Sequence, residues 1–216
     1  MYKVKTIKSF ETYDWLLNRH YAKRIPNITD AFGLYYESIL VGVLTYGIPP
    51  SPSLCRGVCG HEFAGDVLEL NRLCLLNNKK NEASFFVSKT LTMLKKPKII
   101  VSYADTSMNH VGKVYQSCNF IYTGLSAKHT EWRIIGSNKH SKNICKQVPL
   151  SQRLQENSKY QTVDRPQKHR YIYFIGSKKE KKIYKKHLNY SKLSYPKGTS
   201  QKYKTESEPK SQMILF

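Results

Sequence analysis

The sequence is poor in negative charge. Its 216 residues include 15 Asp and Glu against 36 Lys and Arg, which gives a formal net charge of +21 at pH 7. An enzyme acting on a small metabolite does not need this excess. A polyanionic partner would explain it, because each phosphate that contacts Lys or Arg releases counterions and strengthens binding. The composition therefore favours nucleic acid as the partner, with an anionic membrane surface as the rival.

Long apolar runs are also missing. The chain has no run of the roughly 18 apolar residues that a membrane-spanning helix needs, and its first residues, MYKVKTIKSF, contain no apolar signal-peptide core. We therefore predict that the protein has no membrane partner.

Paired metal-binding cysteine motifs are absent as well. The chain has five cysteines without regular spacing: Cys55, Cys59, Cys74, Cys118 and Cys145. An odd number of this kind indicates reduced thiols in a cytosol. Cys55, Cys59 and His61 lie close together in LCRGVCGHEF, so this stretch could form part of a metal site. Zinc sites usually show tighter CxxC pairs and a second pair elsewhere, so an ordinary loop is favoured.

The apolar pattern alternates between helical and strand periods. In chain order it predicts a helix over 9–21, a hairpin of AFGLYY and LVGVLTYG, a long loop IPPSPSLCRGVCGHEFAG, a strand VLELNRLCLL, a helix EASFFVSKTLTMLKK, a strand KIIVSYA, a short helix NHVGKVYQSCN, strands FIYTG and EWRIIG, an irregular excursion over 137–168 and a last strand RYIYFIG. This order is typical of a mixed α/β domain, which we place at 1–176, followed by a basic extension at 177–216.

The extension consists largely of Lys, Tyr and Ser. Its first part is predicted to be a basic helix, and the part beyond Pro196 to be disordered. Lys neutralises phosphate and Tyr can stack on bases, so we expect the extension to hold double-stranded DNA, with a merely solubilising tail as the alternative. The lysines concerned are Lys178, Lys179, Lys181, Lys182, Lys185 and Lys186, and the interleaved tyrosines are Tyr184, Tyr190, Tyr195 and Tyr203.

Polar groups follow the apolar strand in SYADTSMNHVGKVYQSCNF. Asp105 lies at the carboxyl end of that strand, where open α/β sheets bind ligands, and could accept a proton or hold a metal. The alternative is an N-cap for the next helix. Tyr115 and Asn119 are four residues apart and would share a helix face, unless Tyr115 is simply a core residue. Gly112 inside this helix indicates a close approach of its backbone to another element or to a ligand.

Three further residues are candidates for catalysis or binding. His20 and Tyr21 end the first predicted helix, where a His complements the helix dipole or acts as a base or ligand. Strict alternation along VLELNRLCLL places Arg72 on the face of Leu70, with Glu69 on the opposite face. A buried Arg needs a partner, and the candidates are Asp105 and an anionic substrate.

Several motifs together resemble one family. HYAKRIPN, FGLYYESILVGVLTYG, LNRL, SYAD, NHVGKVYQSCNFIYTG and HRYIYFIG occur in an order similar to that of the Mom family of phage DNA-modification proteins. Mom-like proteins are related to GNAT acyltransferases and place a methylcarbamoyl group on N6 of adenine in phage DNA, which shields it from host restriction enzymes. The resemblance implies a GNAT-like domain with a central mixed sheet flanked by helices, in the cytoplasm of an infected or lysogenic bacterial host.

The resemblance also implies roles for individual residues. His20 and Tyr21 match the family's His-Tyr, Arg72 its LNRL arginine, Asp105 its SYAD aspartate and Tyr115 its GxxYQ tyrosine, so all five are expected to be catalytic. Asp105, with His20, would take a proton from N6, and iron is associated with the family, with His20, Tyr21 and Asp105 as the possible ligands here. Further substrate contacts are expected from Ser102, Asn119, Lys23 and Arg24.

The small-molecule group donor is less clear from the resemblance. GNAT enzymes usually carry a Gly-rich loop that cradles the pyrophosphate of acyl-coenzyme A, and here NNKKNEASFF stands in its place without Gly. Lys79, Lys80 and Ser84 are the expected donor contacts. Two alternatives stay open, namely an acetyltransferase acting on an RNA or protein amine, and a non-enzymatic phage DNA-binding protein.

Overall fold

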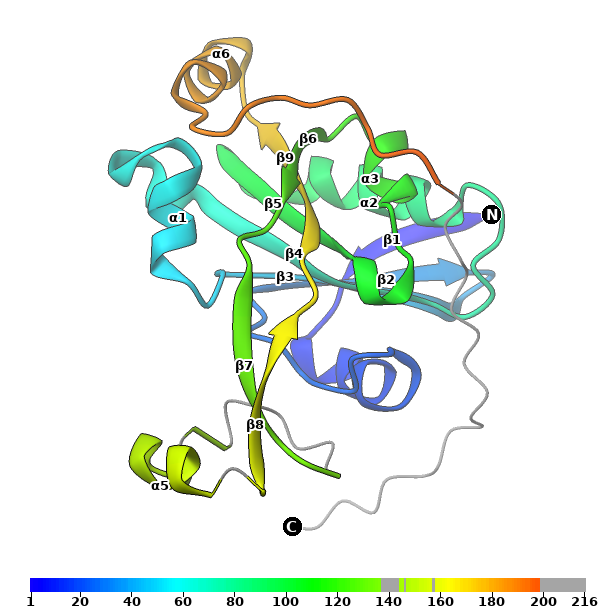
Figure 1. The fold of residues 1–216 in the computed structure, drawn as a ribbon. Coiled ribbons are helices and arrows are strands. Elements are labelled where there is room, and N and C mark those ends of the chain that lie inside the picture. Colours follow the sequence, from blue (N-terminus) through cyan, green and yellow to red (C-terminus); the bar gives the residue numbers. More distant parts are fainter. Residues whose placement is uncertain (137–143, 146, 157, 199–216) are drawn as a thin grey trace.

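The computed structural model describes residues 1–136, 144–145, 147–156 and 158–198. Its main feature is a seven-stranded sheet, with a separate two-stranded sheet beside it (Figure 1). The pair β4–β5 is parallel and the other neighbours are antiparallel. The strands of the large sheet lie in the order β1 (Tyr2–Thr6), β2 (Asp30–Tyr36), β3 (Ile39–Gly47), β4 (Val67–Leu75), β5 (Lys98–Asp105), β9 (Lys168–Ile175) and β6 (Ile121–Leu125).

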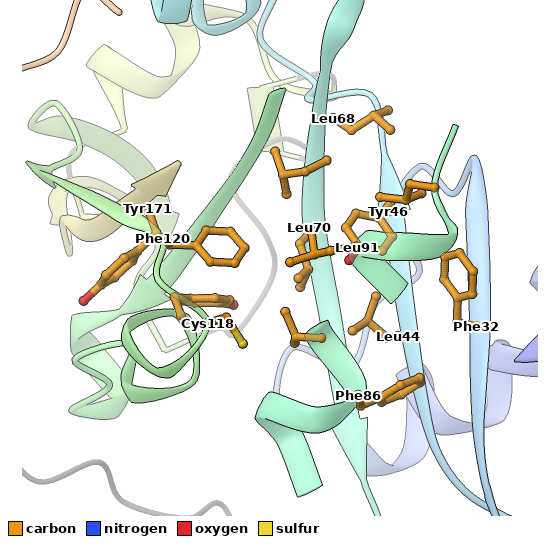
Figure 2. Packing of buried hydrophobic residues seen from close by; sticks show 14 of the residues in the cluster. Phe32, Leu44, Tyr46, Leu68, Leu70, Phe86, Leu91, Cys118, Phe120 and Tyr171 are labelled. Carbon is orange, nitrogen blue, oxygen red and sulfur yellow. The ribbon is translucent and has the colours of Figure 1, made fainter. Parts of the chain in front are cut away.

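Helices cover both faces of this sheet, so the predicted α/β domain with a mixed central sheet is confirmed. On one face, Phe86 and Leu91 of α2 (Glu82–Met93) pack with Leu70 and Phe120, and α3 (Lys113–Ser117) lies beside them (Figure 2). On the other face, α1 (Pro52–Cys59) and α6 (Lys178–His187) pack over β5 and β9. Each large apolar side chain buried in this way contributes about 1.5–3 kcal/mol of transfer free energy.

The predicted hairpin is confirmed as β2–β3. Its turn residues Glu37 and Ser38 have φ of 48° and 71°, the left-handed conformation that a tight two-residue hairpin turn uses at both positions. The other predicted strands are also present, as β4, β5, β6, β9 and β7 (His129–Ile134). No helix among the described residues is long and apolar enough to cross a membrane.

Three expectations about regular structure were wrong. The predicted helix over 9–21 is two short pieces, the 3₁₀ turn η1 (Ser9–Thr12) and the π-helix η2 (Trp15–Arg19). The predicted long loop contains α1 and the 3₁₀ helix η3 (His61–Asp66). The predicted excursion contains α5 (Leu150–Gln155) and β8 (Tyr160–Arg165), and β8 pairs with β7.

All five cysteines are free thiols, as their odd number and irregular spacing suggested. Cys55 and Cys59 lie on α1 inside the apolar cluster, and burial raises the pKa of Cys59 to about 11. His61 is exposed. Packing therefore accounts for this Cys-Cys-His stretch.

The short helix α3 is preceded by Gly112, which is its N-cap residue and not part of its interior. Gly112 has φ +71°, and a Cβ atom there would overlap the ring of Tyr171. The predicted close approach is therefore made by another element of the chain. Tyr171 is fully buried and donates its hydroxyl proton to the carbonyl of Val111.

We expect Gly112→Ala to lower the free energy of unfolding by about 2–4 kcal/mol, because it combines left-handed backbone strain with overpacking of a buried ring. Urea denaturation would measure the change. Gly65→Ala is the matched control, since a Cβ there meets nothing within 4 Å. Equal stability of the two variants would contradict the expected clash.

The first part of the basic extension is a helix, as predicted, and the described tyrosines of the extension contact the domain. Tyr184 is buried and donates to Asp66 at 2.7 Å. Tyr190 lies under the guanidinium of Arg170, 3.5 Å from ring centroid to Cζ, and Tyr195 donates to a main-chain carbonyl of the domain. The described part of the extension is thus packed on the sheet. Tyr203 and the rest of the segment predicted to be disordered, from residue 199 on, lie outside the described residues.

Candidate active site

The site begins with an irregularity in β4. The pairing of β3 with β4 shifts between Thr45 and Tyr46: Arg72 lies opposite Thr45 and Leu70 opposite Tyr46, which leaves Asn71 as an extra residue. An extra residue of this kind is a β-bulge, and it reverses the alternation of side chains beyond it. The predicted placement of Arg72 on the face of Leu70 was therefore wrong.

Side-chain hydrogen bonds hold the bulge. The Asn71 amide oxygen accepts from the Thr45 hydroxyl at 2.6 Å, and its nitrogen donates to the carbonyl of Asn27 at 2.8 Å. The residues on either side confirm the reversal, because Leu70 and Leu73 pack in the same apolar cluster. Arg72 consequently shares its face with Glu69.

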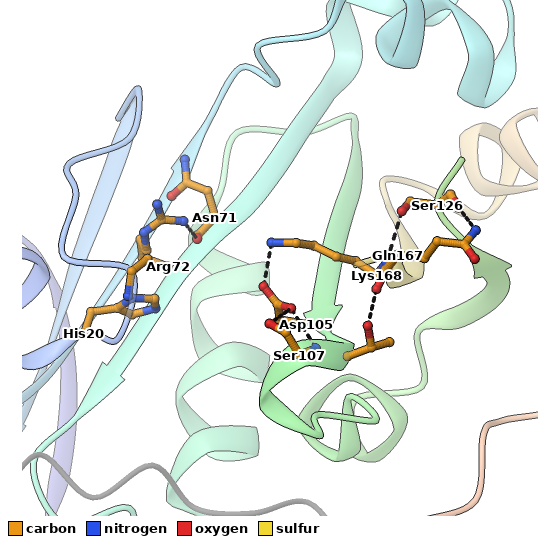
Figure 3. A network of polar contacts seen from close by, with 10 residues as sticks. His20, Asn71, Arg72, Asp105, Ser107, Ser126, Gln167 and Lys168 are labelled. Atoms are coloured by element: carbon orange, nitrogen blue, oxygen red, sulfur yellow. Dashed lines mark hydrogen bonds and ion pairs between the residues drawn. The ribbon is translucent and has the colours of Figure 1, made fainter. Parts of the chain in front are cut away.

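Next to the bulge, β4 and β5 separate. They pair only over Val67–Leu70 and Ile99–Ser102; beyond this, β4 pairs with β3 alone and β5 with β9 alone. Ser102 closes the paired part, as its hydroxyl donates to the carbonyl of Leu70 at 2.9 Å. Ser102 is fully buried, so its hydroxyl joins the two strands and is not open to solvent. Arg72 and Asp105 lie on the two diverging strand ends (Figure 3).

His20 reaches this point directly after η2. It is buried and stacks on Tyr21 with 4.5 Å between ring centroids, and Tyr21 meets His110 edge-on at 6.0 Å. Nδ1 of His20 accepts a hydrogen bond from the amide of Ala22 at 3.1 Å, which places the ring proton on Nε2.

Electrostatics keep the His20 ring neutral. Burial lowers the pKa of His20 to about 3, and the positive charges of Arg72, His110 and Lys168 act in the same direction. Burial likewise raises the pKa of Tyr21. At neutral pH both rings are therefore uncharged, and they present an imidazole N–H and a phenol.

Asp105 makes an ion pair that the sequence did not reveal. Lys168, opposite Asp105 on β9, places its ammonium 2.8 Å from the carboxylate, and Ser107 donates its amide and hydroxyl at 3.1 and 2.6 Å (Figure 3). Burial alone would raise the pKa of Asp105, but the bonds from Lys168 and Ser107 outweigh it and lower that pKa. Asp105 is therefore also the predicted N-cap, here of the 3₁₀ turn η4 (Thr106–Met108).

We expect Lys168→Met to lower the free energy of unfolding by about 1–3 kcal/mol, since it leaves a buried carboxylate without its charged partner. The control is Lys159→Met, which breaks an exposed pair with Glu156 and should cost far less stability, because solvent screens the two charges. Urea denaturation of both variants measures the difference. If Lys168→Met is no less stable than the control, the ion pair does not organise this strand end.

Of the two partners expected for Arg72, Asp105 is excluded, because Arg72 does not pair with it among the described residues. Its NH1 group donates to the carbonyl of Asn71 at 2.6 Å, while its buried Nε has no hydrogen-bond partner within the described part of the chain. Burial lowers the pKa of Arg72, and the neighbouring charge of Arg24 acts in the same direction. Arg72 is thus a half-buried cation whose Nε–H donor is unused.

Glu69 is the functional candidate that the sequence reasoning missed. Burial raises the pKa of its carboxyl group, although the positive charges of Arg72, Lys168 and Arg24 oppose that rise. Among the described residues, the carboxylate makes no hydrogen bond and no ion pair. Only the bulge brings Glu69 and Arg72 to one face, so strict alternation hid the pair.

Tyr115 joins the cluster from α3. It is buried against Phe120 and Tyr171, with ring centroids 5.4 and 5.3 Å away. Burial raises its pKa, and the charges of Tyr21 and Glu69 add to the rise. Tyr115 is therefore both a core residue and a neighbour of the site.

The other predicted substrate contacts are Asn119, Lys23 and Arg24, and the position of Asn119 differs from the prediction. Asn119 lies beyond the end of α3 in a left-handed conformation with φ 59°, and is exposed, so the predicted shared helix face with Tyr115 was wrong. Lys23 and Arg24 are exposed after η2. Arg24 influences the pKa of both Glu69 and Arg72, which places its charge at the site.

The N-terminus of α2, where the donor contacts were predicted, is occupied by the chain's own carboxylate. Buried Glu82 accepts from the amide of Lys79 at 2.8 Å, and the Ser84 hydroxyl donates to the carbonyl of Asn81 at 3.1 Å. The Lys79 ammonium lies over the Tyr36 ring. Lys80 is exposed. A pyrophosphate there would meet a negative charge, so this end of α2 does not favour acyl-coenzyme A.

The predicted iron ligands do not fit an ion as they are arranged. Nδ1 of His20 is already an acceptor, Tyr21 keeps its proton, and both oxygens of Asp105 already accept hydrogen bonds. Within the described residues, no group of three or more His, Cys, Asp and Glu is placed to hold a metal ion. The chemistry proposed below therefore uses only the chain's own groups.

Comparisons with known proteins identify a family. The model of the Mom protein family matches residues 1–197. A search of curated proteins finds no significant match. Among solved structures, a GNAT-family acetyltransferase from Bacillus cereus ATCC 10987 is similar at 14% identity and TM-score 0.43, covering 82% of this chain and 99% of its own.

Two more solved structures are similar to the same degree. A probable acetyltransferase from Staphylococcus epidermidis ATCC 12228 has 10% identity and TM-score 0.47, and covers 82% of this chain and 100% of its own. A Bacillus subtilis acetyltransferase in complex with CoA has 12% identity and TM-score 0.43, with coverage of 82% and 100%. Likeness at this level concerns the fold alone.

Proposed function

The chain belongs to the Mom protein family, and on this premise we propose that it is a phage DNA-modification transferase that adds a methylcarbamoyl group to N6 of adenine in double-stranded DNA. The modification would protect phage DNA from host restriction in the bacterial cytoplasm. The observation that carries the proposal is the pair Glu69 and Arg72, a carboxylate without a partner beside a guanidinium with an unused donor. A buried donor such as the Nε–H of Arg72 is normally paired when its role is purely structural.

The chemistry requires a base. The lone pair of N6 is delocalised into the adenine ring, so N6 attacks only as its proton is removed. A bond then forms between N6 and the carbon of the transferred group, the bond from that carbon to the donor's leaving group breaks, and the leaving group takes the electron pair. The base we propose for the N6 proton is Glu69, because burial raises its pKa towards that of a useful base.

The other residues serve binding and orientation. Arg72 would hold the anionic part of the donor or the departing group through its guanidinium, in the manner of a charge-assisted hydrogen bond. Neutral His20 and Tyr21 would offer hydrogen-bond donors and a stacking surface to a flipped adenine. Asp105, which the sequence suggested as the base, is engaged by Lys168 and is assigned a positioning role.

The test is mass spectrometry of nucleosides digested from the DNA of cells that express the protein. Cells expressing the folded double variant Glu69→Gln, Arg72→Met are the control. A heavier deoxyadenosine found only with the wild type supports the proposal, and its mass names the group. Unmodified adenine in both cultures, with wild-type protein that is folded and binds DNA, would overturn it in favour of a non-enzymatic DNA-binding protein.

A further inference from the structure

The proposed chemistry makes no use of the two-stranded ribbon of β7 and β8. Its strands pair antiparallel from His129 opposite Arg165 to Ile134 opposite Tyr160. The five steps of about 3.4 Å between its six residue pairs give it a length of roughly 17 Å. Figure 1 shows the ribbon running away from the large sheet, beyond the end of that sheet at which β9 begins. A paired ribbon that projects from a domain exposes surface that a partner can use.

The base of the ribbon is fastened to the site. The amide of Ser126 donates to the carbonyl of Lys168 at 2.8 Å, and the amide of Lys168 donates to the Ser126 hydroxyl at 3.0 Å. Thr106, next to Asp105, hydrogen-bonds the carbonyl of Gln167 (Figure 3). Since Lys168 also pairs with Asp105, the direction of the ribbon is fixed relative to the site.

The two faces of the ribbon differ. Directly opposed residues of an antiparallel pair point to the same side, so two rows of side chains can be separated by register. One row packs in part against α5: Tyr160 is buried and the Arg153 guanidinium lies 5.0 Å from the Trp132 ring centroid, while Thr130, Thr162 and Asp164 of this row are exposed. The other row, which we call the basic face, contains the exposed residues His129, Arg133, Gln161 and Arg165 together with half-buried Glu131 and Val163, and Arg133 donates to Glu131 at 2.8 Å.

A two-stranded ribbon fits one part of duplex DNA in particular. The major groove, about 12 Å wide, admits such a ribbon and displays the N6 amino group of adenine, whereas the narrower minor groove does not display N6. A ribbon lying in the major groove next to the site would therefore bring the site to the groove that displays the target atom.

The lysines of α6 lie too far from Asp105 to bring the site to the major groove. Along the paired strands β5 and β9, Asp105 lies opposite Lys168 and Lys98 lies opposite Ile175, and α6 begins just after Ile175. The helix therefore starts about 24 Å from Asp105, at the far end of the strand. At about 3.4 Å per base pair, this corresponds to roughly seven base pairs.

We infer that the β7–β8 ribbon lies in the major groove of double-stranded DNA beside the target adenine, with its basic face towards the phosphates and base edges. The inference rests on the proposed function for the identity of the target atom. The α6 lysines contact the phosphate backbone at a distance and carry no groove preference.

The test compares two double variants that each remove two exposed charges. Arg133→Gln with Arg165→Gln changes the ribbon, and Lys182→Gln with Lys186→Gln changes α6. Thermal unfolding first establishes that both are folded. On a 20-base-pair duplex, dimethyl sulfate reports protection of guanine N7 in the major groove and of adenine N3 in the minor groove, and DNA modification is measured in parallel.

We expect wild-type protein and the α6 variant to protect guanine N7, and the ribbon variant to lose that protection and at least tenfold of the modification. The α6 variant should only bind more weakly, with a smaller salt dependence. Protection of adenine N3 instead, or an unchanged N7 pattern with the ribbon variant, would overturn the inference. Ribbon-dependent N7 protection without any modified adenine would instead refute the proposed function and leave the inference standing.

Discussion

Glu69→Gln is expected to lower the rate of adenine modification by about 10²–10⁴-fold at neutral pH, the range that a positioned general base contributes. The amide has nearly the shape of the carboxyl group but cannot take the N6 proton. Binding of the DNA duplex should not change, because Glu69 lies at the site among Arg72, Arg24 and Lys168 and not on the exposed basic surfaces. The modified fraction of deoxyadenosine over time measures the effect, and Glu37→Gln in the exposed β2–β3 turn is the matched control.

The pH dependence separates Glu69 from the other candidates for the base. A base acts only when ionised, so the rate should rise with pH through the raised pKa of Glu69 and be level above it. The pKa of Asp105 is lowered and that of His20 is about 3, so neither changes charge in the pH range just above the usual carboxyl pKa. We expect the rise of the modification rate with pH, the acid limb of the pH–rate profile, to be lost in Glu69→Gln. Wild-type activity of this variant would instead return the role of base to Asp105.

The regular parts of the fold were predictable where local patterns suffice. The strands β4, β5 and β9 are apolar runs bounded by polar residues, and the hairpin β2–β3 needed only a two-residue turn. The helix α1 also carried a readable signal, since Ser51 caps it by accepting from the amide of Leu54, and Pro52 occupies its first turn. A Ser-Pro start is typical of helices, and the Pro- and Gly-rich composition of the stretch concealed it.

The site could be predicted only in part, because its decisive contacts depend on register between distant strands. The motifs identified Arg72 and Asp105 as residues of interest. Sequence alternation could not reveal the bulge at Asn71, which is set by pairing with β3, and so Arg72 was placed on the face of Leu70, away from Glu69. Lys168 lay in a stretch that had no clear period, and only its position opposite Asp105 gives it a role. Composition likewise cannot tell a tyrosine that stacks on a base from one buried like Tyr184.

Arg72→Met is expected to reduce modification by about 10²–10³-fold, the effect of removing one donor aimed at developing charge. Met retains most of the apolar stem, so the change mainly deletes the guanidinium. Because the buried Nε has no partner within the described residues, its removal should leave the free energy of unfolding unchanged or raise it by about 1–3 kcal/mol. Loss of activity together with equal or higher stability is the mark of a group kept for function.

A structural Arg72 would give the opposite pattern, namely a clearly less stable protein that modifies DNA normally once folded. Urea denaturation and nucleoside mass spectrometry of the same preparations distinguish the two, with Arg56→Met on the exposed side of α1 as the control. Arg72 also lowers the pKa of Glu69. The residual activity of Arg72→Met should therefore need a higher pH than that of the wild type, since without the guanidinium the Glu69 carboxyl group holds its proton more tightly. An acid limb that does not move would show that the two side chains do not act on the same reaction centre.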